Sequence, residues 1–296
     1  MEIKILEFLK KTQYFSNSDI SNLYIEKLYA DSYRIELADE VYELNLYNID
    51  YQIDIYNEIN HKQLEELGSK PKHTYEIGFS KDFNQTYSIR EYREEIDLYS
   101  YLASHGQSEN YNLGRDFGFI LKNLHNMDTD KNVDWYNVFN TKSNYLFYMH
   151  GVNEVGDTDY ILIDYINGHK HLCKNLKTSY LYQNMDANHI FVTKNKFINL
   201  EGLGFNIIGD PAFDFTQVNR IALINSEFTK GLMDEYFDDK KIPIKFFRLL
   251  SLYQAYEILD SIVANRRGEN PKLSRNEIEN LLDMYDNFNH DIPDWI

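Results

Sequence analysis

The chain has 296 residues and a mass of 35.3 kDa, a length that suits one large domain or two lobes, because single hydrophobic cores stop growing at about 250 to 300 residues. Hydrophobic residues make up 43% and charged residues 26% of the sequence, and this composition excludes disorder as the dominant state. Acidic residues outnumber Lys and Arg by 47 to 30 and leave a net charge of -17, which repels phosphate backbones and anionic membranes. We therefore expect no nucleic acid and no membrane as partner. A cationic ligand would be attracted, unless the charge serves only solubility.

The cysteine count and the hydropathy pattern indicate the compartment. Cys173 is the single cysteine, so an internal disulfide is excluded, and no Cys/His spacing typical of a structural zinc site occurs. No stretch approaches the roughly 18 uninterrupted apolar residues of a membrane span. We expect neither an export signal nor a transmembrane helix, and therefore a cytoplasmic protein.

The first third of the chain mixes short helices with strands. Residues 2–12 are expected to form a short helix. Alternation of apolar and polar residues then predicts a hairpin with strands Tyr33–Leu37 and Val41–Tyr47, joined at Ala38–Glu40. A helical stripe follows and ends at Gly68, a candidate C-cap; its apolar residues are Ile55, Ile59, Leu64 and Leu67. Two more strands are expected in 73–79 and 86–92, after which the alternation ends near residue 95.

The rest of the chain has mostly helical periodicity. An apolar face at i, i+3, i+4 and i+7 predicts a helix through Phe117, Ile120, Leu121 and Leu124. One β-rich interruption predicts a hairpin of Ile190–Val192 and Phe197–Leu200 around a polar turn. Near the C-terminus, Ser274 and Glu277 form a capping box before another helix.

The order of these elements, together with three local motifs, resembles the aminoglycoside phosphotransferase and choline kinase family over nearly the whole chain. The motifs are YSIREYREEIDLYSYL at 87–102, GRDFGFILKNLHNM at 114–127 and GDPAFDF at 209–215. The resemblance implies an α+β, two-lobed protein-kinase-like fold. Its N-lobe would span 1–97, with an antiparallel sheet and a helix, and its helical C-lobe would span 98–296.

Phosphoryl transfer in this family requires a phosphate-binding loop and a lysine on the third strand. The chain has no glycine between Met1 and Gly68, so the usual glycine-containing loop is absent. At the lysine position the strand reads LNLY, which places Asn45 there. A neutral amide cannot replace a cation beside a triphosphate. The acidic partner of the lysine would be Glu58, which is equally well explained as a solvated helix residue.

The family's catalytic loop, H-G-D-x-H-x-x-N-I-L-V, corresponds to YQNMDANHIFV at 182–192. The resemblance places Asn184 at the position of the catalytic base, although an amide cannot accept a proton near neutral pH. Asp186 is either a displaced base or a surface acid. His189 stands at a metal-ligand position, although Mg²⁺ prefers oxygen and a packing role is the alternative.

The family's metal-binding strand ends I-D-x-E, and this chain has FINLE at 197–201. Asn199 therefore stands where the metal-binding Asp belongs. In an alternative register, Glu201 would take the metal position. Asp210 and Asp214 are retained, and their role in the family is mostly structural.

These changes favour a pseudokinase that acts by binding a small cationic molecule or a partner protein and needs no cofactor. Acidic residues of the C-lobe would receive a cationic ligand, or else form a solvated surface: Asp234, Glu235, Asp238 and Asp239. The alternative is an active phosphotransferase, with ATP and Mg²⁺, that uses Asp186 as base and Glu201 with His189 on the metal. An accessory subunit that serves assembly is a third hypothesis. We further expect Asn45, Asn184 and Asn199 to face one interlobe cleft.

Overall fold

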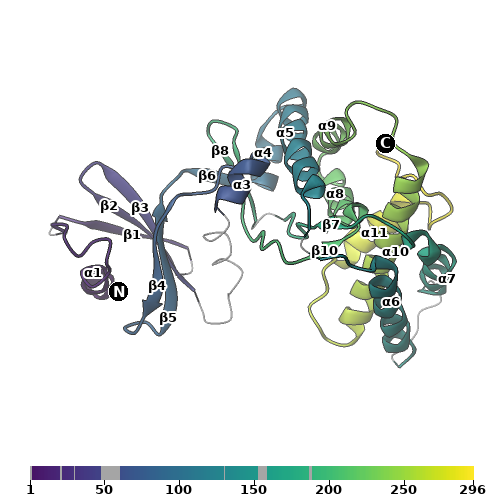
Figure 1. Cartoon of the computed structure of the whole chain (residues 1–296), viewed down its shortest axis with the longest axis horizontal. Helices are drawn as coiled ribbons and strands as arrows, with labels where there is room; N and C mark the ends of the chain where they lie inside the picture. The colour runs from purple at the N-terminus through teal and green to yellow at the C-terminus, as the bar shows by residue number, and fades with distance from the viewer. Residues whose placement is uncertain are drawn as a thin grey trace. The chain divides into compact units, whose positions relative to one another are not determined.

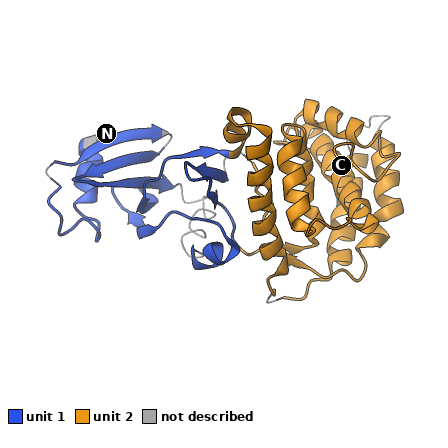
Figure 2. Cartoon of the chain, turned by 90° about the horizontal axis from the view of Figure 1, so that it is seen from above, with its two compact units in different colours: residues 1–97, 188–204 blue, residues 98–187, 205–296 orange. Residues whose placement is uncertain are grey.

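The fold is described from a computed structural model for residues 2–20, 22–29, 31–47, 61–129, 131–152, 159–186 and 189–296 (Figure 1). Contacts between residues divide the chain into two compact units (Figure 2). Unit 1 comprises residues 1–97 and 188–204, and unit 2 comprises residues 98–187 and 205–296. Ile55, Glu58 and Ile59, for which the sequence predicts a helix, lie outside the described residues.

The centre of unit 1 is a five-stranded antiparallel sheet with the strand order β1-β2-β3-β5-β4. Its strands are β1 (Tyr24–Tyr29), β2 (Ser32–Leu37), β3 (Glu40–Tyr47), β4 (Thr74–Ser80) and β5 (Gln85–Glu91). Four of these strands were predicted from alternation. β1 was missed, because its letters YIEKLY alternate only weakly.

One face of this sheet forms the apolar core of unit 1. Leu44 of β3 and Ile89 of β5 are fully buried on it, and α1 (Glu2–Leu9) adds Ile5 and Leu9. The side chains of a strand alternate between its two faces. Glu43 and Asn45, which flank Leu44 on β3, therefore point to the opposite face of the sheet. Burying each large apolar side chain contributes about 1.5 to 3 kcal/mol, so this face fixes the register of the sheet.

The opposite face of the same strands is polar and nevertheless buried. Glu43 pairs across the β3–β5 ladder with Arg90, and Asn45 pairs with Ser88. All four side chains are buried. Charged groups removed from water must be paired or hydrogen-bonded, so this face requires partners from elsewhere in unit 1.

A second, three-stranded sheet of unit 1 has the order β6-β8-β9 and comprises β6 (Glu95–Asp97), β8 (Ile190–Thr193) and β9 (Ile198–Leu200). The predicted hairpin is confirmed, with Ile190 opposite Leu200. The sequence analysis placed this hairpin in the helical lobe, whereas contacts group it with unit 1. The reason is that β8 pairs with β6 along Glu95–Asp97, and the Lys70 amide donates to the Ile198 carbonyl at 2.8 Å.

The helix α3 (His61–Leu67) precedes this contact and ends as expected at Gly68. Gly68 has a φ of 100°, and the Ser69 amide returns to the Leu64 carbonyl at 3.0 Å. This geometry is a glycine C-cap. It directs the chain into the segment that reaches β9.

Unit 2 is helical, and its core surrounds the long helix α10 (Ile244–Arg266). The other α-helices are α4 (Leu98–Ser104), α5 (Gln107–Asn126), α6 (Trp135–Gly151), α7 (Asp159–His169), α8 (Phe215–Ala222), α9 (Ser226–Tyr236) and α11 (Arg275–Met284). Short elements complete it: η1 (Lys170–Cys173), η2 (Pro211–Phe213) and the paired strands β7 (Ser179–Tyr180) and β10 (Ile208–Gly209). The capping box of Ser274 and Glu277 is confirmed at the start of α11. Within the described ranges, no helix is long and apolar enough to cross a bilayer.

Helices α5 and α9 approach each other through glycines. A Cβ atom on Gly114 would overlap the Phe228 carbonyl, and one on Gly231 would overlap the Tyr111 carbonyl. The predicted face of Phe117 and Leu121 is buried beside this contact. Close backbone packing therefore fixes the pair of helices that carries Asp234 and Glu235 on α9 and Arg115 on α5.

Candidate functional site

Asn45 lies on the buried polar face of the sheet, at the position where the family resemblance calls for lysine. Its Nδ2 donates to Glu43 Oε1 at 3.0 Å, and the two residues are 5% and 2% exposed. They share a face because they are two residues apart on β3. The amide thus stabilises a neighbouring carboxylate of its own strand.

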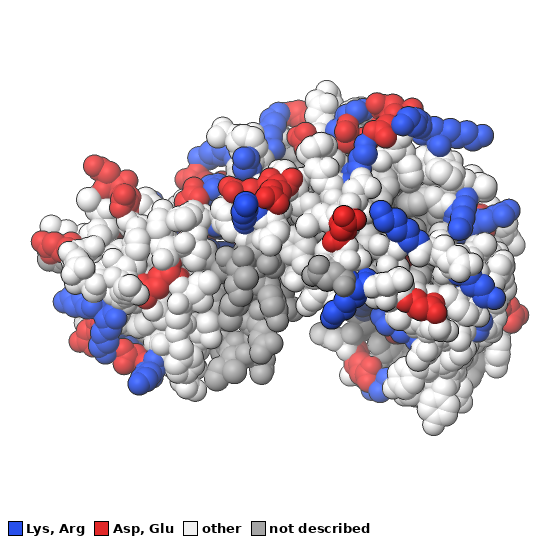
Figure 3. All heavy atoms as spheres, in the orientation of Figure 1, with Lys and Arg blue, Asp and Glu red and all other residues white. Residues whose placement is uncertain are grey.

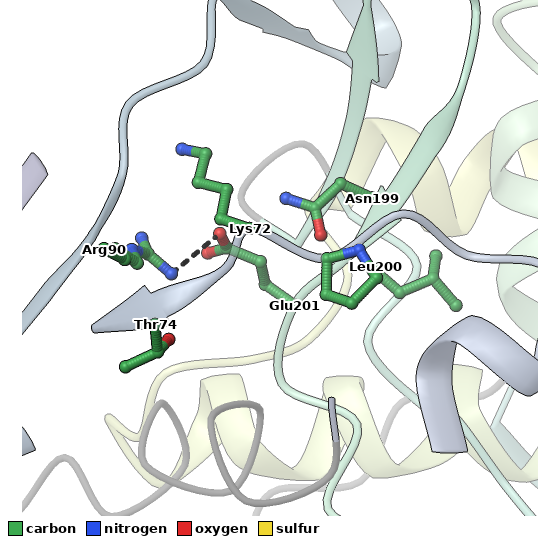
Figure 4. A pocket seen from close by; sticks show the side chains of 7 residues that line it. Lys72, Thr74, Arg90, Asn199, Leu200 and Glu201 are labelled. Atoms are coloured by element: carbon green, nitrogen blue, oxygen red, sulfur yellow. Dashed lines mark ion pairs between the residues drawn. The ribbon is translucent and has the colours of Figure 1, made fainter. Parts of the chain in front are cut away.

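Two cations reach the same carboxylate from different segments. Lys72 Nζ lies 2.7 Å from Glu43 Oε2 and 3.4 Å from Glu95 Oε2. Arg90 Nη2 lies 3.1 Å from Glu43 Oε1, and its Nη1 lies 3.3 Å from Glu201 Oε1 (Figure 4). Each cation is therefore held between two carboxylates. We call Glu43, Lys72, Arg90, Glu95 and Glu201 the charged cluster.

Asn199, at the position of the family's metal-binding Asp, is bonded to this charged cluster. It lies on β9 opposite Phe191 of β8, is buried, and its Nδ2 donates to Glu95 Oε2 at 3.2 Å. Asn45 and Asn199 are thus connected through Glu43, Lys72 and Glu95. The two amides that sequence reasoning placed at the cation and metal positions belong to one network of unit 1.

Burial and charge act in opposite directions within the charged cluster. Burial by itself raises the pKa of Glu43, but the charges of Arg90 and Lys72 and the Asn45 hydrogen bond lower it to about 2. Burial disfavours the charged form of Lys72, yet Glu43 and Glu95 raise its pKa. For Glu95, burial outweighs Lys72 and Asn199, so its pKa is raised. Glu43 is therefore held in its ionised form, whereas the protonated form of Glu95 is favoured.

A small pocket opens beside the charged cluster. Figure 4 shows its lining, which comprises Pro71, Lys72, Thr74, Arg90, Asn199, Leu200 and Glu201. In the part of the chain that the structure describes, no group of three His, Cys, Asp or Glu side chains is arranged to hold a metal ion. The resemblance implies Mg²⁺ and ATP here; both cations of the pocket pair with carboxylates, and the residue at the metal position is an amide that donates to one.

Residues 182–186 of the segment that corresponds to the catalytic loop lie in unit 2, where Asp214 fixes their backbone. The Asp214 carboxylate accepts hydrogen bonds from the backbone amides of Tyr182 at 2.7 Å and Gln183 at 3.0 Å, and it pairs with His125 Nε2 at 3.0 Å. On the other side of Asn184, the Met185 amide donates to Gln217 Oε1 at 2.7 Å. The backbone on both sides of Asn184 is thus held by buried acceptors.

Asp210, the other retained acid, is also structural. The Tyr253 hydroxyl donates to its Oδ2 at 2.7 Å, Trp135 Nε1 donates to the same hydroxyl at 2.8 Å, and the Asp210 side chain caps η2 through the Ala212 amide. These contacts agree with the structural role expected for Asp210 and Asp214. They join the segment after β10 to α6, α10 and the loop before β8.

The structure distributes the predicted site residues over both units. Asn45, Asn199 and Glu201 meet at the charged cluster of unit 1. His189 also lies in unit 1, where its carbonyl accepts the Glu201 amide at 2.7 Å. Asn184 and Asp186 are half-buried in unit 2, and Glu58 lies outside the described residues. That Asn184 shares one cleft with Asn45 and Asn199 stays a prediction.

Sequence reasoning missed four members of the network, namely Glu43, Lys72, Arg90 and Glu95. A signal for Glu43 was present, because strand alternation puts it on the same face as Asn45. Lys72 lies between α3 and β4, outside any helix or strand. Its contact with Glu43 depends on tertiary structure, and no periodicity could reveal it.

Four acidic residues of α9 and the following turn contact side chains of α5, namely Asp234, Glu235, Asp238 and Asp239. Tyr111 donates to Asp234 at 2.8 Å, and Arg115 bridges Glu235 at 2.6 Å and Asp239 at 2.9 Å. Lys122 pairs with Asp238. On the face drawn in Figure 3, Lys and Arg side chains likewise stand among Asp and Glu side chains. These contacts favour a paired surface over an open acidic site.

Comparison with known proteins rests on structure alone, since no protein-family model and no curated protein matches the chain. Aminoglycoside phosphotransferase APH(2'')-Ib with bound ADP superposes with a TM-score of 0.58 at 17% identity, over 95% of this chain and 97% of that one. APH(4)-Ia gives 0.64 at 11% identity, over 90% and 93%. A choline/ethanolamine kinase family protein from Mesorhizobium loti gives 0.61 at 10% identity, over 98% and 97%. The expected α+β fold is confirmed: this chain has the protein-kinase-like fold of the aminoglycoside phosphotransferases and of the choline/ethanolamine kinase family protein.

Proposed function

We propose that this chain is a pseudokinase, which has the fold of aminoglycoside phosphotransferases but does not transfer phosphate from Mg·ATP. The observation that carries this proposal is the pairing in the charged cluster. Lys72 lies between Glu43 and Glu95, and Arg90 lies between Glu43 and Glu201. Two carboxylates at each cation compensate its charge, so a phosphate group would meet little net attraction there.

The charge of the charged cluster supports the same conclusion. Its three carboxylates are matched by Lys72, Arg90 and the neighbouring Arg93, whose Nη1 lies 3.8 Å from Glu95 Oε1, so no positive charge is left over, and Asn45 adds none. Each charge-assisted hydrogen bond that a triphosphate cannot form forfeits about 1.5 to 3 kcal/mol. In a chain of net charge -17, no long-range field compensates for that loss. We therefore propose that neither ATP nor Mg²⁺ is a cofactor.

The loop around Asn184 in unit 2 supports the pseudokinase proposal independently of the charged cluster. The family resemblance puts Asn184 at the position of the base, and an amide has no proton-accepting form near neutral pH. A general base typically contributes 10² to 10⁴-fold to such a reaction. A ligand that reached this loop would be bound without the proton transfer that the chemistry needs.

The ligand that we propose is a small cationic molecule, with a partner protein as the second possibility. The net charge of -17 favours a cation. Among proteins of this fold, APH(2'')-IIa forms a ternary complex with streptomycin and ATP, and APH(4)-Ia one with hygromycin B and AMP-PNP. We propose a cytoplasmic location, where such molecules and partners would be met.

One observation favours the alternative of an active phosphotransferase. The Glu201 amide donates to the His189 carbonyl, so the residues of the alternative metal site are neighbours at the open end of the β8–β9 hairpin. The Glu201 side chain, however, pairs with Arg90. In this alternative Asp186 would be the base, and Asp186→Asn and Glu201→Gln would each abolish turnover.

Calorimetric titration of the chain with ATP, with and without Mg²⁺, tests the proposal. We expect a dissociation constant of about 1 mM or weaker in both cases, which corresponds to no more than about 4 kcal/mol of binding free energy. Adenosine is the control ligand, because it lacks the phosphates; the proposal requires ATP to bind no more tightly than adenosine. Micromolar binding that depends on Mg²⁺ would contradict it and favour the active enzyme.

A further inference from the structure

A pocket of about 580 Å³ opens in unit 2 between the end of α10 and the start of α11. Its volume lies within the range of roughly 300 to 1,000 Å³ that is typical of small-molecule sites. The described residues that line it come from α7, α10, α11 and the turn between the last two helices, and all of them belong to unit 2. The pocket can therefore be described within a single compact unit.

The turn between α10 and α11 explains why a pocket forms there. Gly268 has a φ of 70°, and the Glu269 amide donates to the Ala264 carbonyl at 2.9 Å, so a glycine C-cap ends α10. The Leu273 amide then donates to Ser261 Oγ at 3.2 Å, which returns the chain to the side of α10. α11 therefore begins beside the last turns of α10, and the pocket lies between the two helices.

The pocket has an apolar wall. Ile278 and Leu282 lie four residues apart on α11, so their side chains share one face of that helix. Ile262 of α10 and Leu273 of the turn line the same pocket. Leu273 is buried, whereas Ile262, Ile278 and Leu282 are only half-buried. Removing apolar surface from water is favourable, so this wall favours a ligand with an apolar body.

Two arginines and two acids also line the pocket. Arg266 Nη1 donates to Asp159 Oδ2, which also pairs with His150 Nε2 at 2.9 Å. Arg275 Nε donates to Glu279 Oε1 at 3.0 Å. A guanidinium carries five N–H donors, of which each of these contacts uses one. The charges of the two acids are therefore compensated, while the arginines retain donors for a ligand.

The start of α11 adds backbone donors at the same place. Ser274 is the N-cap of this helix and lines the pocket beside Arg275. The first amides of a helix have no carbonyl partner within it, and the helix dipole favours a negative charge at this end. Together with the donors of the two arginines, this arrangement favours an anionic group over a cationic one.

We propose that this pocket binds a small organic carboxylate whose apolar body covers Ile262, Ile278 and Leu282. Arg266 and Arg275 would hold the carboxylate, because a guanidinium presents its donors in the geometry that a carboxylate accepts. The inference goes beyond the proposed function and does not rest on it, since the proposed cationic ligand and this anion require different sites.

α10 separates this pocket from the segment that contains Asp210. Tyr253, which donates to Asp210, lies in the middle of α10, and Arg266 is the last residue of that helix. At about 1.5 Å per residue, the two positions are about 20 Å apart along the helix axis. The pocket is therefore distinct from the motif at 209–215, which fixes the loop around Asn184.

The experiment measures, by calorimetry, how tightly the protein binds three ligands that share a ten-carbon chain: decanoate, decan-1-ol and decyltrimethylammonium. All three are used below the concentrations at which they form micelles. Because a charge-assisted hydrogen bond is worth about a factor of ten in affinity, we expect decanoate to bind about tenfold more tightly than decan-1-ol. Decyltrimethylammonium should bind no more tightly than decan-1-ol. This order identifies the carboxylate and the apolar chain as the recognised groups.

Arg275→Gln tests the contact with the carboxylate. The Arg275 side chain is 93% exposed in its pair with Glu279, so the fold should be unaffected. We expect the variant to bind decanoate about tenfold more weakly and decan-1-ol as the wild type does. Arg267→Gln is the matched control, because it removes the same charge from an arginine that pairs with Glu269 at 2.6 Å and lies outside the lining. It should leave both affinities unchanged.

Ile278→Asp tests the apolar wall, because it places a charge there. It should weaken the binding of decanoate and of decan-1-ol alike, by at least about tenfold. Ile224→Asp is the control, since Ile224 is 52% exposed in unit 2 and lies outside the lining. Circular dichroism without ligand verifies the fold of each variant. If Ile278→Asp does not fold, Ile278→Ala decides by the same criterion, which is weaker binding of both ligands.

A folded wild type that does not bind decanoate at about 1 mM overturns the inference. Equal affinity for decanoate and decan-1-ol, or tighter binding of decyltrimethylammonium, also overturns it, because the pocket would then not select an anion. An equal loss of decanoate binding in Arg267→Gln and Arg275→Gln overturns the assigned site, since net charge would then be the cause.

Discussion

The buried face around Asn45 and the loop around Asn184 have both lost charges that the family resemblance calls for, but their surroundings differ. In the loop, the supporting contacts are intact, because Asp214 still holds the amides of Tyr182 and Gln183. In the sheet, a network that includes Lys72 stands where a single lysine was expected. Two regions that depart from the family pattern can thus differ, one with its supporting contacts intact and the other with a new network of ion pairs.

The difference follows from what each position demands physically. Asn184 is half-buried and carries no charge, so its replacement takes no charge out of a buried ion pair. Replacement of a buried carboxylate such as Glu43 does, and removing one partner of a buried pair costs about 3 to 5 kcal/mol. Substitutions of the buried acceptors should therefore lower the free energy of unfolding. Substitutions of the loop residue Asn184 should instead leave stability nearly unchanged and bear only on catalysis.

The largest effect is expected for Asp214→Ala in unit 2. The substitution leaves two backbone amides and His125 without their buried acceptor, and each such group costs about 1 to 3 kcal/mol. We expect the free energy of unfolding to fall by about 4 kcal/mol, as measured by urea denaturation. Asp238→Asn is the control, because its pairs with Lys122 and Lys240 are exposed and should contribute less than about 1 kcal/mol. Equal losses in the two variants would show that the loop is not held by Asp214.

A somewhat smaller effect is expected from pH at Glu43. Its folded-state pKa is lowered from 4.5 to about 2, so the ionised carboxylate contributes its full stability above about pH 4.5. That contribution is lost as the pH falls through the folded-state pKa. One pKa unit corresponds to about 1.4 kcal/mol, which gives about 3 kcal/mol in all. Glu43→Gln should flatten the fall in melting temperature between pH 4.5 and pH 2, and a profile identical to the wild type would contradict this assignment.

Lys72→Met should lower the free energy of unfolding by less than protonation of Glu43 does, because Glu43 keeps its contacts with Arg90 and Asn45. We expect a loss of about 2 kcal/mol in the unfolding free energy, below the usual cost of breaking a buried pair. Lys11→Met is the matched control, since that lysine is 63% exposed in its pair with Asp82. It should cost less than about 1 kcal/mol. A loss at Lys72 no larger than at Lys11 would mean that the charged cluster contributes little to folding.

The contrast between the regions also shows what the sequence could predict. Periodicity located β2 to β5, the hairpin of β8 and β9 and the helix through Phe117, because each buries an apolar face in a regular pattern. Motif order predicted the fold and the structural role of Asp214. These features depend on residues that are close in sequence or that follow a family spacing.

The charged cluster could be predicted only in part. Asn45, Asn199 and Glu201 were found through the family resemblance, but Lys72 and Arg90 were not, because long-range ion pairs leave no periodic signal. The strand β6, at Glu95–Asp97, was missed for a related reason. Three residues are too few to show alternation, and their pairing with β8 spans almost a hundred positions in sequence.

The smallest effect on stability is expected for Asn184→Asp, which puts a carboxylate at the position that the family resemblance assigns to the catalytic base. Asn184 is half-buried, and Asp214 and Gln217 fix the backbone beside it, so the substitution should change the unfolding free energy by less than about 0.5 kcal/mol. The same variant should show no ATP turnover, because the charged cluster still offers no cation for the phosphates. A coupled assay for ADP release tests this, with Asn184→Asp combined with Glu43→Gln and Glu201→Gln as the comparison. Turnover by the single variant would show that the missing carboxylate at position 184 alone prevents catalysis. Turnover only in the combined variant would show that the loop and the charged cluster both prevent it.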